Sequence, residues 1–192
     1  MNPLFFYALK PILTLISILS YMSGHAQEYI ITPNMIGNTS LGDEMTVLRR
    51  TFPQNTIHLT PGSQYGVDGP GNGFLISLNP SDTLMFVWSK DYGKTIGGIV
   101  CLSSSYKIVD NLCIGSTLGD IEKLHPYIYL VPSYLNASIE YVTVRYSDGS
   151  INLEVISQQG KQIGIYEPNS EDEPSTKNYD RSVKINRMVI WK

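Results

Sequence analysis

The sequence predicts an α+β fold of two tandem repeats, each a short helix followed by an antiparallel β-sheet. Three observations lead to this prediction. A five-residue motif occurs twice, a short helical segment ending before a proline follows each copy, and most of the remaining chain alternates with period two between turn residues. We therefore expect one repeat over residues 27–105 and a second over residues 106–192.

The repeated motif is Thr39-Ser40-Leu41-Gly42-Asp43, which returns 77 positions later as Ser116-Thr117-Leu118-Gly119-Asp120. An Ile-Gly pair stands just upstream of each copy. The last apolar segments of the two halves, residues 96–100 and 185–190, are also similar. The order of motif, helix, strands and closing strand thus matches between the halves, which favours a duplication.

Helices are predicted at residues 44–51 and 121–125. Thr39 or Ser40 in the first copy, and Ser116 or Thr117 in the second, are suited to cap the first backbone N–H groups of a helix. The aspartates of the motif would then lie near the first turn, where the helix dipole favours negative charge. These acidic residues are explained without catalysis.

Strands are predicted where β-branched and aromatic residues recur at period two between turn residues. They cover residues 57–59, 73–78, 83–88, 94–102, 128–131, 139–146, 151–157, 161–166 and 183–191. Residues 60–72 are rich in glycine and proline, and residues 167–181 are acidic and polar, so both are predicted as loops. The Glu171-Asp172-Glu173 run lacks the ligand spacing of a calcium loop and is interpreted as a solvated tip.

The N-terminus is typical of a secretory signal peptide. Lys10 precedes a mostly apolar run from Pro11 to Met22, and Gly24 and Ala26 place small side chains where a signal peptidase requires them. The alternative is an uncleaved anchor, but Lys10 and Pro11 interrupt the apolar run, which is short for a bilayer. We expect residues 1–26 to be removed and the protein to be exported from a bacterial cell, to the periplasm or the medium.

Composition limits the partners. Without residues 1–26 the chain carries 13 basic and 17 acidic residues, a balance that disfavours nucleic acid because phosphate binding needs a basic face. No later apolar run is long enough to span a membrane. The histidines and cysteines lack the spacing of a zinc site, and no cofactor motif occurs, so we expect no metal and no cofactor.

Two cysteines, Cys101 and Cys113, lie in the predicted mature part. In an oxidising compartment they are close enough in sequence to close a short loop by a disulfide, which would stabilise the fold by roughly 3 kcal/mol. The alternative is a pair of buried free thiols at strand ends. The sequence leaves both open.

Candidate catalytic groups form no recognisable constellation. No G-x-S-x-G motif is present, and the Gly69–Gly73 segment lacks the lysine and helix of a phosphate loop. Two carboxylate pairs, Asp110 with Asp120 and Glu140 with Glu154, are conceivable acid and base groups, but their spacing singles out neither. The sequence therefore favours a protein without enzymatic activity.

Tyrosines offer a better functional clue. The chain contains 13, and five of them gather early in the second half. On a half-exposed sheet, tyrosine gives a large contact area and is common at binding surfaces, although it is equally ordinary at cross-strand positions. The candidate binding surface comprises Tyr127, Tyr129, Tyr134, Tyr141 and Tyr146.

The two motif-bearing units resemble the layout of the β-lactamase inhibitor protein family and of the small envelope modules that include the assembly lipoprotein BamE. This resemblance rests on the two Ile-Gly-x-Thr/Ser-Leu-Gly-Asp-like turns and on the order of helix and strands. It implies a binding module outside the cytoplasm, with an inhibitor-like role conceivable. The chain differs from these families in its two cysteines, where the inhibitor has two disulfides, and in having no lipid-attachment cysteine near the signal.

Three functions follow, in order of preference. The first is an exported, non-enzymatic module that presents a β-sheet surface to a protein or envelope partner. The second is a structural or assembly component of the cell envelope, and the third is a hydrolase with an unrecognised site.

Overall fold

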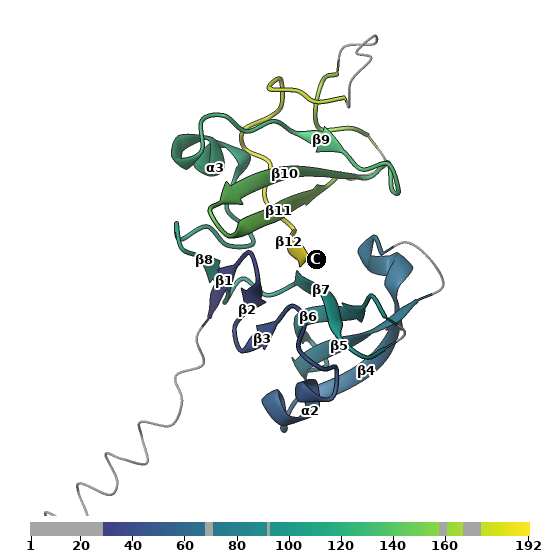
Figure 1. The fold of residues 1–192 in the computed structure, drawn as a ribbon. Helices are drawn as coiled ribbons and strands as arrows, with labels where there is room; N and C mark the ends of the chain where they lie inside the picture. Colours follow the sequence, from purple (N-terminus) through teal and green to yellow (C-terminus); the bar gives the residue numbers. More distant parts are fainter. Residues whose placement is uncertain (1–28, 68–70, 92, 158–160, 167–173) are drawn as a thin grey trace, which may run out of the picture.

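A computed structural model of the chain describes residues 29–67, 71–91, 93–157, 161–166 and 174–192. Within these residues the fold is mostly β, with an eight-stranded antiparallel sheet, a four-stranded sheet and two short α-helices (Figure 1). The predicted signal peptide, residues 1–26, lies outside the described residues, as does the acidic tip at residues 171–173.

The large sheet joins both halves of the chain. Its strands lie in the order β4 (Thr56–Pro61), β5 (Asn72–Asn79), β6 (Asp82–Ser89), β7 (Ile96–Cys101), β12 (Arg187–Trp191), β11 (Gly149–Ile156), β10 (Ile139–Tyr146) and β9 (Val131–Pro132). The two halves meet where Val100 of β7 pairs with Val189 of β12. Figure 1 shows β4 to β7 at one end, β9 to β11 at the other, and the C-terminus near the junction.

A second layer covers one face of this sheet. It consists of the small sheet, in the order β3 (Thr39–Ser40), β2 (Met35–Ile36), β1 (Ile30–Thr32) and β8 (Lys107–Ile108), together with α2 (Val47–Thr51) and α3 (Leu118–Leu124). One core cluster unites side chains from β1, β2, β8 and both helices with the large sheet, among them Ile31, Ile36, Leu48, Ile108, Ile121, Ile99 and Leu153. Burial of these apolar groups is the main force that holds the layers together.

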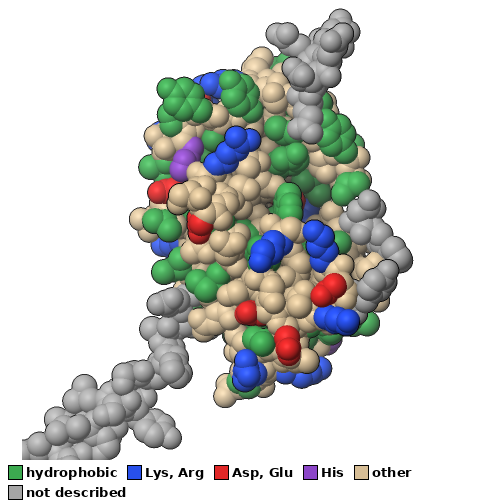
Figure 2. All heavy atoms as spheres, in the orientation of Figure 1, with side chains coloured by type: hydrophobic (Ala, Val, Ile, Leu, Met, Phe, Trp, Pro, Cys, Tyr) green, Lys and Arg blue, Asp and Glu red, His purple; other side chains and the backbone are tan. Residues whose placement is uncertain are grey.

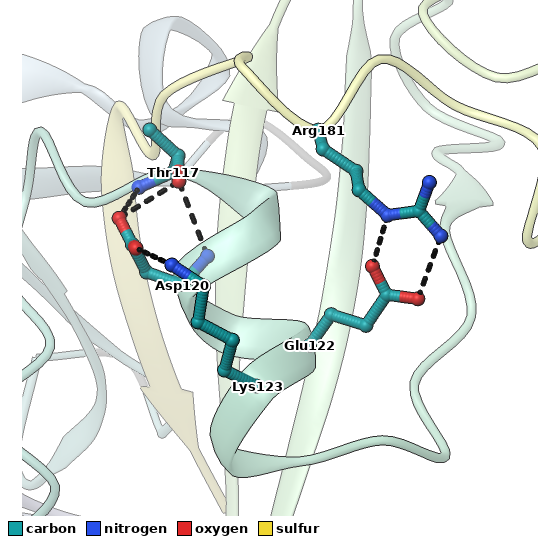
Figure 3. Close-up of polar contacts among 5 residues, drawn as sticks. All are labelled: Thr117, Asp120, Glu122, Lys123 and Arg181. Carbon is teal, nitrogen blue, oxygen red and sulfur yellow. Dashed lines mark hydrogen bonds and ion pairs between the residues drawn. The ribbon is translucent and has the colours of Figure 1, made fainter.

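Helix α3 begins with a capping box, as Figure 3 shows. The Thr117 hydroxyl accepts a hydrogen bond from the Asp120 N–H at 3.1 Å, and the Asp120 carboxylate accepts one from the Thr117 N–H at 3.1 Å. On the other side of the helix the Glu122 carboxylate accepts two bonds from the Arg181 guanidinium. Of the two predicted caps, Ser116 and Thr117, the structure has Thr117, and the helix begins at Leu118, three residues before the predicted start.

The predicted fold class is wrong. The protein is mostly β and does not consist of two repeats that each carry a helix and a sheet of their own. The helices contain five and seven residues only. The strands of the two halves join in one sheet through the β7–β12 pair, and β1 and β8 pair in a separate layer. Tertiary pairing between distant strands overrode the local order on which the prediction rested.

Two local predictions also need correction. Thr39 and Ser40 do not cap a helix but form β3, and α2 starts later, at Val47. Residues 161–166 form no strand: the buried Glu140 carboxylate accepts the N–H groups of Ile163 and Gly164, and the pairing of this segment with the chain is an isolated bridge from Gly164 to Tyr179. No helix in the described residues is both long and apolar enough to cross a bilayer.

Candidate functional site

The other face of the large sheet carries a different set of side chains. One row of register partners crosses six strands on this face: Leu75, Phe86, Val100, Val189, Asn152 and Thr143. The row is apolar from β5 to β12 and polar on β11 and β10. Phe86, Val100 and Val189 form a second, smaller core cluster, separate from the main one. We call this side of the sheet the open face.

Two tryptophans lie beside this cluster. Trp88 of β6 and Trp191 of β12 are both register partners of Gly98 on the intervening β7. A Cβ atom on Gly98 would lie 2.0 Å from Cζ2 of Trp88, so the glycine lets the Trp88 indole lie across β7. These are the only two tryptophans in the sequence.

A groove of about 420 Å³ runs over this part of the sheet, and we call it the aromatic groove. One wall is the 3-10 turn η1 (Gly62–Tyr65), whose Tyr65 ring stacks on Phe86 with centroids 4.3 Å apart. The loop containing Tyr134 and Leu135, both largely exposed, also lines the groove. Trp88 and Trp191 also line it, and Trp191 is 54% exposed. Such a half-open aromatic hollow provides contact area at low entropic cost.

One lining residue of the groove, Glu154, belongs to a buried ion pair. The Glu154 carboxylate lies 3.2 Å from Nε of Arg187, and the side chains are only 13% and 8% exposed. The two atoms make no hydrogen bond with each other or with another described group, so the contact is electrostatic. The pKa of Glu154 is raised above its ordinary value, because the effect of burial is larger than the opposing effect of the positive charge of Arg187. Arg187 also donates to the backbone carbonyl of Gln64, at 3.4 Å, and so ties η1 to the sheet.

A second hollow, of about 670 Å³, lies beside β10. Its lining includes Tyr127, Tyr129, His125 and Arg145. The Lys177 ammonium stands over both tyrosine rings, 5.8 Å and 4.7 Å from their centroids. Figure 2 shows hydrophobic side chains, basic side chains and a histidine gathered on the upper half of the face in view, over α3 and β10. We call this the β10-edge hollow.

The five predicted tyrosines divide among these places. Tyr134 lines the aromatic groove, Tyr127 and Tyr129 line the β10-edge hollow, and Tyr141 lines both. Tyr146 instead packs against the core, where its hydroxyl donates to Asp110 at 3.2 Å. Burial, and then the charge of Asp110, raises the pKa of Tyr146. The structure therefore places four of the five tyrosines in the two hollows.

The sequence-based set missed Tyr65, Trp88 and Trp191. The sequence did contain a sign that the second face of β6 makes contacts, since residues 83–88 are apolar at nearly every position. A strand that is apolar on both sides indicates cover or contact on both faces. Phe86 and Trp88 belong to the side opposite Met85 and Val87, which pack in the main core.

The four candidate carboxylates form no acid–base pair. Asp110 contacts His125 and Tyr146, and Asp120 belongs to the capping box. Glu140 is fully buried and accepts bonds from residues 163, 164 and 166, whereas Glu154 faces Arg187 on the open face. Among the described residues no three histidine, cysteine, aspartate or glutamate side chains gather as a metal site would require.

The structure carries Cys101 and Cys113 as free thiols. Cys101 is buried beside Met85 and Met188, its register partners. Burial is the main cause that raises the pKa of the Cys101 thiol to about 12; the hydrogen bond to the Ser103 carbonyl opposes this shift, and the nearby Cys113 adds to it. Cys113 is half-buried and contacts the Ser116 hydroxyl. Of the two alternatives that the sequence left open, the structure has the free thiols and not the disulfide.

Comparison with known proteins informs the fold alone. No protein-family model matches the chain, and no curated protein matches it. One solved structure, the uncharacterized protein YfeY from Escherichia coli, is similar with a TM-score of 0.50 and 11% identity. The match covers 84% of this chain and 99% of YfeY. The sheet arrangement therefore occurs in another protein, while this likeness carries no information on function.

Proposed function

We propose that this protein is an exported, non-enzymatic binding module whose partner, a protein or a component of the cell envelope, binds in the aromatic groove. The observation that carries the proposal is that both tryptophans of the chain line one groove on the open face of the sheet. Tryptophan, tyrosine and arginine are the side chains most enriched among residues that dominate binding energy at interfaces.

The composition of the groove supports a ligand-binding role. Trp191, Tyr134 and Leu135 are each more than half exposed, an unfavourable placement for apolar groups unless a partner covers them. The Glu154–Arg187 pair and the amide of Asn152 add a few fixed polar groups among apolar walls. That combination is typical of binding pockets, in which apolar contact gives affinity and polar groups fix orientation.

The test begins with capture. Wild-type protein, the Trp191→Ala/Tyr134→Ala double variant and a Leu59→Ala control are immobilised and exposed to bacterial periplasm, envelope extract and culture medium. Leu59 is a matched control because it is exposed to a similar extent but lies on β4, away from the groove. A groove partner is retained by the wild type and the control and lost from the double variant.

Tryptophan fluorescence then gives a direct measurement. Because both tryptophans lie in the groove, emission reports this site and little else. Titration of the captured partner into the wild type should shift the wavelength of tryptophan emission and reduce its quenching by acrylamide. The affinity for the partner should be about tenfold or more lower in the double variant. Equal retention by all three proteins, with unchanged emission on titration, refutes the groove as the binding site.

A further inference from the structure

The edge of β10 carries unpaired backbone groups. In an antiparallel strand, alternate residues direct their N–H and C=O groups to the same edge. Ile139 bonds Asn136 and Ser133 on the β9 side, so Tyr141, Thr143 and Arg145 face that side too. Strand β9 pairs only with Glu140 and Tyr141. In the described part of the chain, no backbone partner meets Thr143 or Arg145 at this edge.

The β10-edge hollow stands where the next strand would lie. If β9 continued backwards in its register, Tyr129 would oppose Thr143 and Tyr127 would oppose Arg145. The chain diverges instead, because Leu130 pairs with Thr176 in both hydrogen-bond directions. Figure 1 shows β9 beside only one end of β10, with α3 near the other end. The space between is the hollow of about 670 Å³.

The charge around this hollow is positive. Arg145 lines it, and Lys177 stands over the rings of Tyr127 and Tyr129. The acidic groups nearby already have partners: Asp110 contacts His125 at 2.9 Å, and Glu122 is held by the Arg181 guanidinium. A ligand with negative side chains therefore complements the hollow.

The opposite edge of the sheet differs. Strand β4 ends in Pro61, which has no N–H to offer a further strand. Proline is a common way to blunt an edge against further pairing. Strand β10 contains no proline, and its Thr143 hydroxyl bonds the Asn152 side chain on the sheet face.

We infer that β10 accepts an added strand: an extended, acidic peptide segment of a protein partner that pairs with the backbone of Thr143 and Arg145. Main-chain hydrogen bonds would provide affinity, and Arg145, Lys177 and the two tyrosines would select acidic side chains. This site goes beyond the proposed function, since it involves the strand edge and the chemistry of a backbone, not the aromatic groove.

The probe is a short capped peptide in which valine alternates with aspartate and threonine. Two matched peptides carry lysine in place of aspartate or a fully N-methylated backbone, which cannot donate hydrogen bonds. Binding to the full chain is followed by amide chemical shifts. We expect shifts centred on Thr143 and Arg145 with the acidic peptide, about tenfold weaker binding of the lysine peptide and loss of binding after N-methylation.

Protein variants complete the test. Arg145→Glu should weaken the acidic peptide about tenfold, while Arg50→Glu, an exposed basic position on α2, should leave it unchanged. Thr143→Pro removes the outward N–H, together with the hydroxyl bond to Asn152, and should abolish binding, with a melting curve to verify folding. The inference is overturned if the acidic peptide does not bind, if the N-methylated peptide binds equally well, or if the shifts lie on β4 or in the aromatic groove.

Discussion

The two faces of the eight-stranded sheet are both apolar at their centre, but one is covered by the second layer and the other lines a groove. On the covered face, Ile99, Leu153 and Met188 are fully buried beneath the small sheet and the two helices. On the open face, Val100 and Val189 lie beside tryptophans, an amide and a buried ion pair. Apolar packing thus fills the centre of the covered face, whereas the centre of the open face combines apolar and polar groups.

The largest effect is expected on the covered face. Leu153→Ala should lower the free energy of unfolding by about 4 kcal/mol, because Leu153 is fully buried and the cavity cannot collapse between two layers. Its neighbour Asn152, on the open face, provides the contrast. Asn152→Ala removes one acceptor from the Thr143 hydroxyl and should lower the free energy by about 1 kcal/mol. Urea denaturation measures both, and equal losses would contradict the assignment of the faces.

The buried ion pair gives the next largest effect. Arg187→Met leaves the Glu154 carboxylate buried without its counter-charge and should lower the free energy of unfolding by about 3 kcal/mol at neutral pH. Because burial raises the pKa of Glu154 above that of the unfolded chain, protonation favours the folded state. The loss should therefore shrink as the pH falls towards 4.5, the ordinary value for the group.

A double variant separates charge from packing. Arg187→Met combined with Glu154→Leu removes both charges and should recover most of the lost stability. It should still weaken partner binding, since the groove loses the Glu154 carboxylate. Stability that stays low in the double variant would mean that the Arg187 contact with the Gln64 carbonyl is the dominant contribution.

The third effect concerns the aromatic groove. Gly98→Ala would place a Cβ atom 2.0 Å from the Trp88 ring and force the indole out of its position. We expect a loss of about 2 kcal/mol in the free energy of unfolding, as for other overpacked sites, and greater quenching of tryptophan by acrylamide. Gly71→Ala is the control, because nothing lies within 4 Å of its added Cβ. Unchanged quenching in Gly98→Ala would show that Trp88 does not lie across β7.

The sequence was most informative where local pattern decides structure. The period-two segment from Ile139 to Tyr146 matches β10 residue for residue, and Thr117 caps α3 as expected. Local pattern failed where a distant group intervened. Residues 161–166 look like a strand, but the buried Glu140 carboxylate takes two of their N–H groups.

The candidate site depended even more on distant pairing. Trp88 and Trp191 come together only because β7 lies between β6 and β12, and no local signal determines that order. The tyrosines were found because they cluster in sequence, and four of them line the two hollows. Tyr146 shows the limit of composition, since its hydroxyl has an interior partner. The small sheet and the two helices cover one face of the large sheet and leave the other face open to a partner. The sequence does not show which face they cover.

The smallest effect tests that covering layer through α3, which packs Leu118 and Ile121 into the main core. Thr117→Ala removes the cap and should lower the free energy of unfolding by about 1 kcal/mol at neutral pH.

Hydrogen bonds from the Thr117 side chain and N–H, and the nearby Lys123, lower the pKa of Asp120 from 3.8 to about 2. A depressed pKa means that Asp120 stabilises the fold above pH 3.8 and that this contribution disappears as the pH falls towards 2. The wild type should therefore lose more stability than Thr117→Ala across this range, so that their melting temperatures converge in acid. If the two curves stay parallel, the capping box does not hold the Asp120 charge, and the helix is fixed by its apolar contacts alone.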